Sequence, residues 1–67
     1  MSHPFKLILA EIHRVSAAAA WHSKNLEVAR TQYRKFQELA PNSGEFERAE
    51  QWLERINWKE NQILKED

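Results

Sequence analysis

Cysteine is absent from this 67-residue sequence. Its absence excludes disulfide bridges, cysteine-containing zinc sites and thiol chemistry, and it suits a reducing compartment. Glycine occurs once and proline twice. The chain therefore has no glycine-rich loop that could hold a phosphate group, and it has too few turn residues for a protein built of strands.

An excess of charge of either sign is also lacking, because ten basic residues balance ten acidic ones. Binding to nucleic acid requires a basic excess on one face, so we expect no nucleic-acid partner. The charges are unevenly distributed along the chain. Residues 1–40 carry six basic and three acidic residues, whereas residues 41–67 carry four basic and seven acidic ones. Halves of opposite sign favour antiparallel packing or head-to-tail pairing of copies.

Long apolar runs are missing as well. No stretch approaches the roughly 20 apolar residues of a membrane span, and the helical surface is not dominantly basic, so we expect no membrane partner. Lys6 and Glu11 interrupt the apolar segment near the start, which is not typical of a secretory signal. We expect a cytoplasmic protein.

The residues that are present predict an all-α protein with a single helical domain over 1–67. The only strong break is the segment Ala40-Pro41-Asn42-Ser43-Gly44, in which proline ends one helix and Ser43 can cap the next. Apolar or small residues recur three and four positions apart on both sides of this break. They are Phe5, Ile8, Ile12, Val15, Ala19, His22, Leu26, Ala29, Tyr33, Phe36 and Ala40 before it, and Phe46, Ala49, Leu53, Ile56 and Ile63 after it. Glu60 interrupts the second series.

Two architectures fit this pattern. In the first, a long helix over about 4–39 and a second over about 44–65 form an antiparallel hairpin with a coiled-coil-like seam. In the second, the first segment breaks near 22–25, where Ser23 and Asn25 can cap a helix, and a three-helix bundle results. In either case the seam position predicts that His22 is partly buried.

The long-helix architecture leaves apolar residues uncovered. At 1.5 Å per residue the first helix would measure roughly 54 Å and the second about 33 Å, so the second would end near Ala19. Phe5, Ile8, Leu9, Ile12 and Val15 would then be exposed. A patch of this size is rare on soluble monomers. We expect it to be covered by a folded-back segment, by a second copy or by a partner.

Residues 26–42 resemble the second helix of a tetratricopeptide repeat. Ala29, Tyr33, Leu39, Pro41 and Asn42 occupy the positions where that family has a small residue, an aromatic residue and a closing Leu-x-Pro-Asn. Upstream the pattern departs from the family, since His13 and Ser16 stand where it has a large aromatic residue and a leucine. Microtubule-interacting-and-transport domains show similar spacing. The resemblance implies a helical scaffold that binds protein.

Candidate chemistry is sparse, and we expect neither an enzyme nor a metal or cofactor site. His13 and His22 lie nine residues apart, whereas helical metal ligands are spaced by three or four. No nucleophile–base pair occurs, and Glu47, Glu50 and Glu54 are expected to form a solvated face. His22 is better explained as a packing residue.

Three tryptophans are the remaining candidates for contact with another protein, because tryptophan is enriched at interface hot spots. Trp52 lies beside Leu53 and is expected in the core. Trp21 is off the seam, and Trp58 lies on the polar side of the second segment. The predicted protein-binding residues are Phe5, Ile8, Leu9, Ile12, Val15, Trp21 and Trp58. The predicted function is a small interaction module, an adaptor, regulator or inhibitor of a larger protein. The alternative is a self-assembling structural protein, a homodimeric four-helix bundle.

Overall fold

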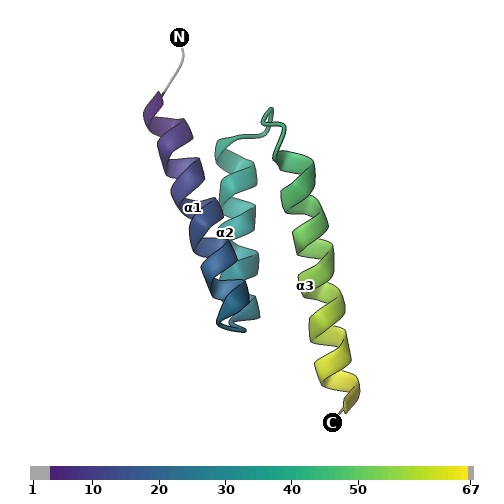
Figure 1. Cartoon of the computed structure of the whole chain (residues 1–67). Helices are drawn as coiled ribbons and strands as arrows, with labels where there is room; N and C mark the ends of the chain where they lie inside the picture. The colour runs from purple at the N-terminus through teal and green to yellow at the C-terminus, as the bar shows by residue number, and fades with distance from the viewer. Residues whose placement is uncertain (1–3, 67) are drawn as a thin grey trace.

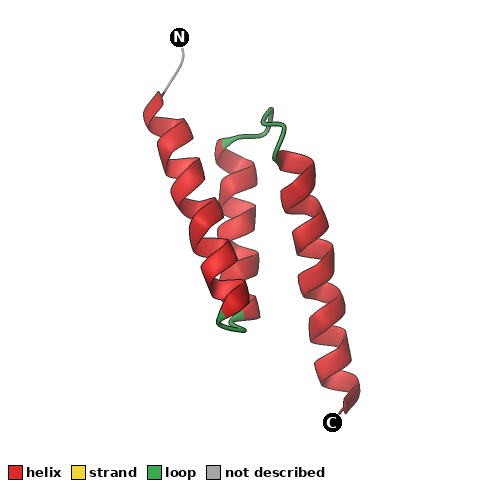
Figure 2. Ribbon diagram, in the orientation of Figure 1, coloured by secondary structure: helices red, strands yellow, loops and turns green. Residues whose placement is uncertain are grey.

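Three helices and no strands make up the part of the chain that the computed structural model describes, residues 4–66. They are α1 (Pro4–His22), α2 (Leu26–Leu39) and α3 (Phe46–Glu66), and Figures 1 and 2 show them joined by two short connections. The prediction of an all-α chain is confirmed. The two-helix hairpin with a continuous helix over 4–39 is wrong, because the chain reverses near 22–25, as the three-helix alternative expected.

The reversal after α1 is made by three residues that satisfy the helix ends with backbone hydrogen bonds. The amide of Asn25 donates to the carbonyl of Ala20 (2.8 Å), and the amide of Lys24 donates to that of Trp21 (3.0 Å). These two bonds form a Schellman-type ending, which requires a left-handed residue at the position of Lys24. Lys24 has a φ of 62°. Asn25 then caps α2, since its side-chain oxygen accepts from the amide of Val28 at 3.3 Å.

The connection between α2 and α3 follows the predicted break. The amide of Ala40 donates to Phe36 at 2.9 Å, and Pro41 follows where the helix cannot continue. The hydroxyl of Ser43 accepts from the amide of Glu45 at 3.0 Å, which satisfies a donor that precedes α3. Helix α3 begins at Phe46, two residues later than the sequence suggested.

Each helix runs antiparallel to the next and packs mainly against its neighbour in sequence (Figure 1). Helix α3 has 21 residues and α2 has 14, so α3 extends beyond the turn between α1 and α2. The described part of the molecule is elongated, measuring 50 × 19 × 13 Å.

The core between the helices is built largely from alanine. Six of its ten buried apolar residues are alanine, and Ala17 of α1 and Ala29 of α2 have no exposed surface. Small side chains allow helix backbones to approach closely, so α1 and α2 form a tight pair. The buried residues are Ala10, Ala17, Ala20, Ala29, Tyr33, Phe36, Ala40, Ala49, Leu53 and Ile56.

Polar contacts between neighbouring helices fix how they align. His13 of α1 is hydrogen-bonded through Nδ1 to Gln32 of α2. The amide group of Gln37 on α2 donates to the carbonyl of Phe46 (3.3 Å) and to the carboxylate of Glu50 (2.8 Å).

Arg30 of α2 forms an ion pair with Glu60 of α3, and both side chains are partly buried. Glu60 therefore interrupts the apolar series of α3 because it faces a basic partner. The pair joins the basic half of the chain to the acidic half, in line with the antiparallel packing that the charge distribution favours.

Candidate protein-binding surface

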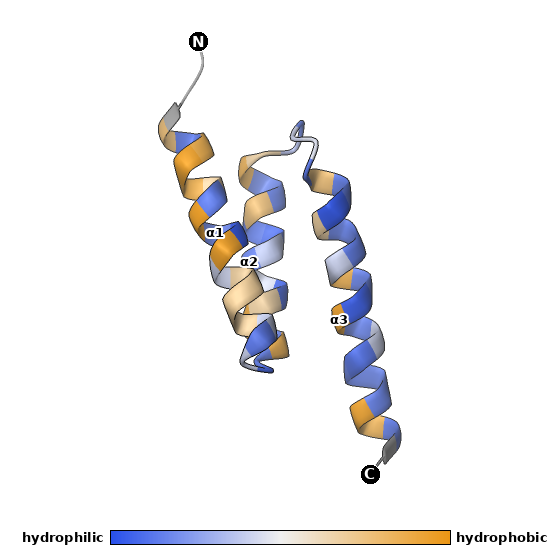
Figure 3. Cartoon of the chain, in the orientation of Figure 1, coloured by the Kyte–Doolittle hydropathy of each residue, from blue (hydrophilic) through white to orange (hydrophobic). Residues whose placement is uncertain are grey.

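One face of α1 displays large apolar side chains to solvent. Phe5, Ile8, Ile12 and Val15 are 73%, 56%, 53% and 53% exposed, and we call these four residues the outer stripe. Their spacing of three, four and three residues places them on one side of the helix. In Figure 3 the N-terminal half of α1 carries much of the apolar colouring of the molecule.

The small buried residues of α1 lie on the side away from the outer stripe. At about 100° per residue, the direction of Ala10, Ala17 and Ala20 differs from that of the stripe by about 150°. Helix α1 thus has two apolar faces. The small face packs against α2, and the large face is exposed.

Folding back α1 therefore does not cover the predicted patch, contrary to the expectation that a folded-back segment is one way of burying it. The sequence placed the large residues of α1 on the same seam as Tyr33 and Phe36. The structure buries only the α2 part of that seam. Leu9, at 40% exposed, lies beside the stripe. His22 is also exposed, so the prediction that it is partly buried is wrong.

The outer stripe itself carries no charged residue, and the nearest charged group is already paired. Arg14 donates from Nε to Glu11 at 3.0 Å and makes a second bond through its terminal nitrogen. The hydrogen bond from Arg14 lowers the pKa of Glu11, and the same bond raises the pKa of Arg14. These two charges compensate each other at the edge of the stripe.

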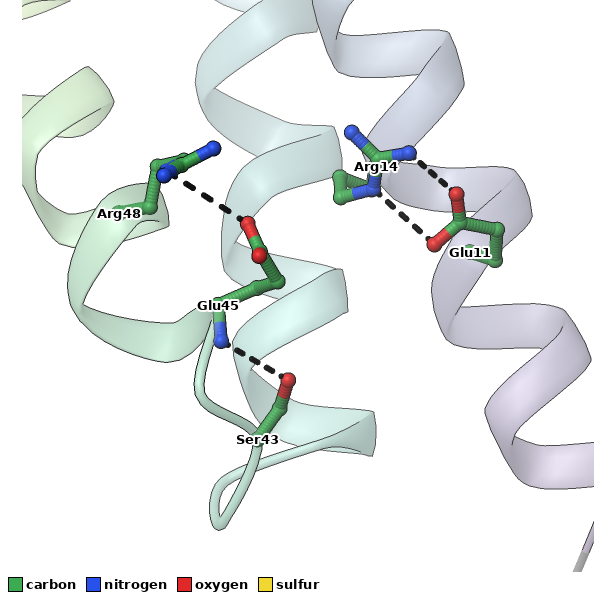
Figure 4. A network of polar contacts seen from close by, with 5 residues as sticks. All are labelled: Glu11, Arg14, Ser43, Glu45 and Arg48. Carbon is green, nitrogen blue, oxygen red and sulfur yellow. Dashed lines mark hydrogen bonds and ion pairs between the residues drawn. The ribbon is translucent and has the colours of Figure 1, made fainter.

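Arg14 lies on the inner side of α1, next to the start of α3. Arg14, Glu45 and Arg48 line one small cavity, and Figure 4 shows the Glu11–Arg14 pair together with the contacts of Glu45. The carboxylate of Glu45 lies 3.7 Å from Nε of Arg48, and the backbone amide of Glu45 donates to the hydroxyl of Ser43. Arg14 and Glu45 therefore face the cavity between the helices, whereas Glu11 is exposed beside the outer stripe.

The predicted tryptophans form a second surface at the other end of α1. Trp21 meets Trp52 edge-on, with ring centroids 5.2 Å apart at 66°, and Tyr33 stacks on Trp52 at 6.0 Å and 7°. The guanidinium of Arg55 covers Trp52 at 4.7 Å. Trp21 and Trp52 are half-buried against the core, so this cluster joins all three helices.

Trp58 is 60% exposed on α3 and shares an open groove with Trp21. The other residues of this groove, Glu54, Arg55 and Lys59, are charged. The structure thus separates the predicted binding residues into two groups. The outer stripe with Leu9 forms one, and Trp21 with Trp58 forms the other.

Sequence reasoning missed a third apolar region where α3 extends past the first turn. Ile63 and Leu64 are exposed there, and Ile63 lines a groove of about 290 Å³ with Trp21, His22, Lys24, Leu26 and Lys59. The sequence does contain the signal for this region. The helix between Asn25 and Pro41 is shorter than the helix after Gly44, so the C-terminal end of α3 extends beyond α2.

Comparisons of the chain with models of protein families, with curated proteins and with solved structures found no match. Within residues 4–66, no helix combines the length and the apolar composition that crossing a bilayer requires. No group of three His, Asp or Glu side chains in the same residues is placed to hold a metal ion. The function is therefore inferred from the surface itself.

Proposed function

We propose that this chain is a small protein–protein interaction module, an adaptor, regulator or inhibitor of a larger protein, that binds through the outer stripe. One observation carries this proposal. Helix α1 packs its small face on α2 and leaves Phe5, Ile8, Ile12 and Val15 more than half exposed. Soluble monomers rarely expose contiguous apolar patches larger than a few hundred Å², and larger patches mark interaction sites.

The same proposal includes a helix arrangement of the tetratricopeptide type, with α1 and α2 as one repeat and α3 as the first helix of the next. Ala17 and Ala29 are fully buried at the two positions where that family has small packing residues. Tyr33 is buried at the aromatic position, and Pro41 and Asn42 lie in the connection to α3. Distances from α3 to α1 and α2, measured by nuclear magnetic resonance in solution, would test this arrangement.

A module of this kind acts by contact and catalyses no reaction, in keeping with a sequence that offers no nucleophile–base pair. We place it in the cytoplasm, because a chain without cysteine suits a reducing compartment. Fractionation of cells that produce the protein would check the location.

The test of the proposed function is an affinity capture with three baits. The first is the natural chain, and the second carries Ile8→Glu and Ile12→Glu in the outer stripe. The third, a matched control, carries Gln51→Glu and Asn57→Glu, which add the same charge on exposed positions of α3. We expect the natural chain and the control to capture the same protein and the stripe variant to lose it, since charges in a desolvated apolar interface are costly.

A fourth bait, Trp58→Ala, separates the two surfaces. If the groove of Trp21 and Trp58 contributes to binding, this variant captures less of the same protein while its helical content stays unchanged. Equal capture by the natural chain and the stripe variant would contradict the proposal that the outer stripe is the binding surface.

A further inference from the structure

We propose that the outer stripe is covered by the outer stripe of a second copy, with the two α1 helices antiparallel about a two-fold axis. This inference rests on the proposed function in one respect, that the stripe is an interface. It adds a second copy as an occupant of the stripe and gives the register of the contact. The larger protein of the proposed function then binds the stripe in place of the second copy.

The spacing of the stripe is the first support. Its steps of three, four and three residues read the same in both directions. An interface with two-fold symmetry uses the same patch on both copies and must be self-complementary. A two-fold axis at the level of Ala10 places Phe5 opposite Val15 of the second copy, and Ile8 opposite Ile12. All four residues of the stripe are then paired, with none left over.

The exposed area is the second support. From their exposed fractions, the stripe and Leu9 present roughly 500 Å² of surface per copy, so two copies cover about 1,000 Å², the size at which specific interfaces begin. Polar groups around the rim add to this area. Complete burial of these residues therefore brings the contact to the lower limit of specific interfaces.

The charges around the stripe are the third support. A contact between identical surfaces brings like charges together, which destabilises it unless those charges are compensated. Glu11 lies one residue from the proposed axis and is already paired with Arg14 of its own chain. The antiparallel arrangement also sets the two helix dipoles in opposite directions.

Access to the stripe is open in the described structure. The stripe lies on the side of α1 that faces away from α2, and α3 packs against the opposite side of the helix pair (Figure 1). A second copy can therefore approach α1 without displacing another helix. A monomer and a dimer of this kind have the same internal fold.

The first experiment is analytical ultracentrifugation of the full chain over micromolar to millimolar concentrations. We expect a reversible dimer in the natural chain and in the Gln51→Glu, Asn57→Glu control. In the Ile8→Glu, Ile12→Glu variant, we expect dimerisation at least about 100-fold weaker, with tenfold for each substituted position as a lower bound. Circular dichroism verifies folding, and since Ile8 and Ile12 are exposed in the monomer, the helical content of the variant should not change.

The second experiment tests the register, and the absence of cysteine makes it clean. One sample of the chain carries Ile8→Cys, and a second sample, labelled with heavy nitrogen, carries Ile12→Cys. The two are mixed and oxidised, and the disulfide-linked dimers are weighed by mass spectrometry. Random pairing of equal amounts would make the mixed dimers equal to the two like pairs combined. The antiparallel register predicts that the mixed dimers exceed this combined amount.

Three results would overturn the inference. They are a natural chain that stays monomeric at millimolar concentration, a dimer that survives the two glutamates, and an excess of like disulfide pairs, which marks a parallel contact. A monomer that still captures another protein through the stripe would reject the second copy while leaving the proposed function standing. Loss of capture in a chain that dimerises as expected would reject the proposed function alone.

Discussion

Lys24 has an unusual conformation for its residue type. It holds the left-handed position that ends α1, with a φ of 62°, while the only glycine of the chain, Gly44, has a φ outside that region. A left-handed backbone costs a residue with a Cβ roughly 1–2 kcal/mol, and glycine avoids that cost. The residue best suited to this turn is therefore absent from it.

Replacing Lys24 with glycine is expected to raise the free energy of unfolding by about 0.5–1 kcal/mol, because relief of the left-handed strain exceeds the entropy that glycine gains in the unfolded chain. Urea unfolding followed by circular dichroism measures the change. Lys24→Ala is the matched control, since it removes the same charge but keeps the Cβ, and it should bring no gain. A stabilisation of equal size in both variants would trace the effect to the charge.

At the scale of the residue, the sequence alone predicts the helix-capping residues better than it predicts the strained, left-handed backbone of Lys24. Asn25 and Ser43 are recognisable because short polar side chains accept bonds from backbone amides at helix starts. Asn25 accepts from an amide within α2, whereas Ser43 accepts from the amide of Glu45, which precedes α3. Nothing about lysine signals a left-handed backbone. The conformation of Lys24 follows from the need of α1 to reverse within three residues, which is a property of the packed helices.

Helix α1 shows, at the scale of the element, how periodicity can select the wrong face. The pattern of large residues continues unbroken from α1 into α2, so it suggested one seam. Close packing of α1 on α2 depends on small residues, and alanines carry little weight in an apolar pattern. The sequence predicted that Phe5 to Val15 lack cover in the long-helix hairpin only. They are exposed in the three-helix fold as well, because α1 is rotated so that its small face meets α2.

The packing of the two faces of α1 can be compared by making the same alanine-to-leucine substitution at two positions, Ala17 and Ala19, and measuring the stability of each variant. Ala17→Leu inserts three carbons into the closed contact with α2 and is expected to cost about 1–3 kcal/mol of stability. Ala19→Leu adds the same atoms on the exposed side and should leave stability nearly unchanged. Thermal unfolding of dilute samples compares them. The seam inferred from the sequence gives the opposite order, with Ala19→Leu as the damaging change.

Tyr33 matters at the scale of the whole molecule because its ring stacks on Trp52, which in turn meets Trp21, so the cluster connects α1, α2 and α3. Burial raises the pKa of Tyr33, and the nearby positive charge of Arg14 opposes this shift. The folded protein therefore holds the phenolic proton more tightly than the unfolded chain does. This contribution to stability is complete below about pH 10 and is lost as the pH rises through the folded pKa.

The expected outcome is a loss of stability above about pH 10 that is smaller in Tyr33→Phe than in the natural chain. Urea unfolding at about pH 8 and about pH 11 gives the two differences. Tyr33 is the only tyrosine of the sequence, so ultraviolet titration of tyrosinate reports its pKa directly. A pKa at or below that of the unfolded chain would contradict the expectation.

The arrangement of the whole molecule could be predicted in class but not in detail. Residue patterns predicted the all-α content, the second connection and the alternative of three helices. They could not determine which face of α1 meets α2, or that Trp21 and Trp58 share a groove away from the outer stripe. Those features depend on the rotation of each helix about its axis, which the close approach of alanines sets.

The packing of each helix mainly on its neighbour in sequence has a consequence for how the chain folds. Contacts between adjacent helices close only short loops, so little chain entropy is lost before the first of them forms. Helices α1 and α2 can form a hairpin before α3 joins it, and no long-range pairing has to be found by search. For a chain near the lower size limit for independent folding, the order of its helices thus favours fast assembly through local steps.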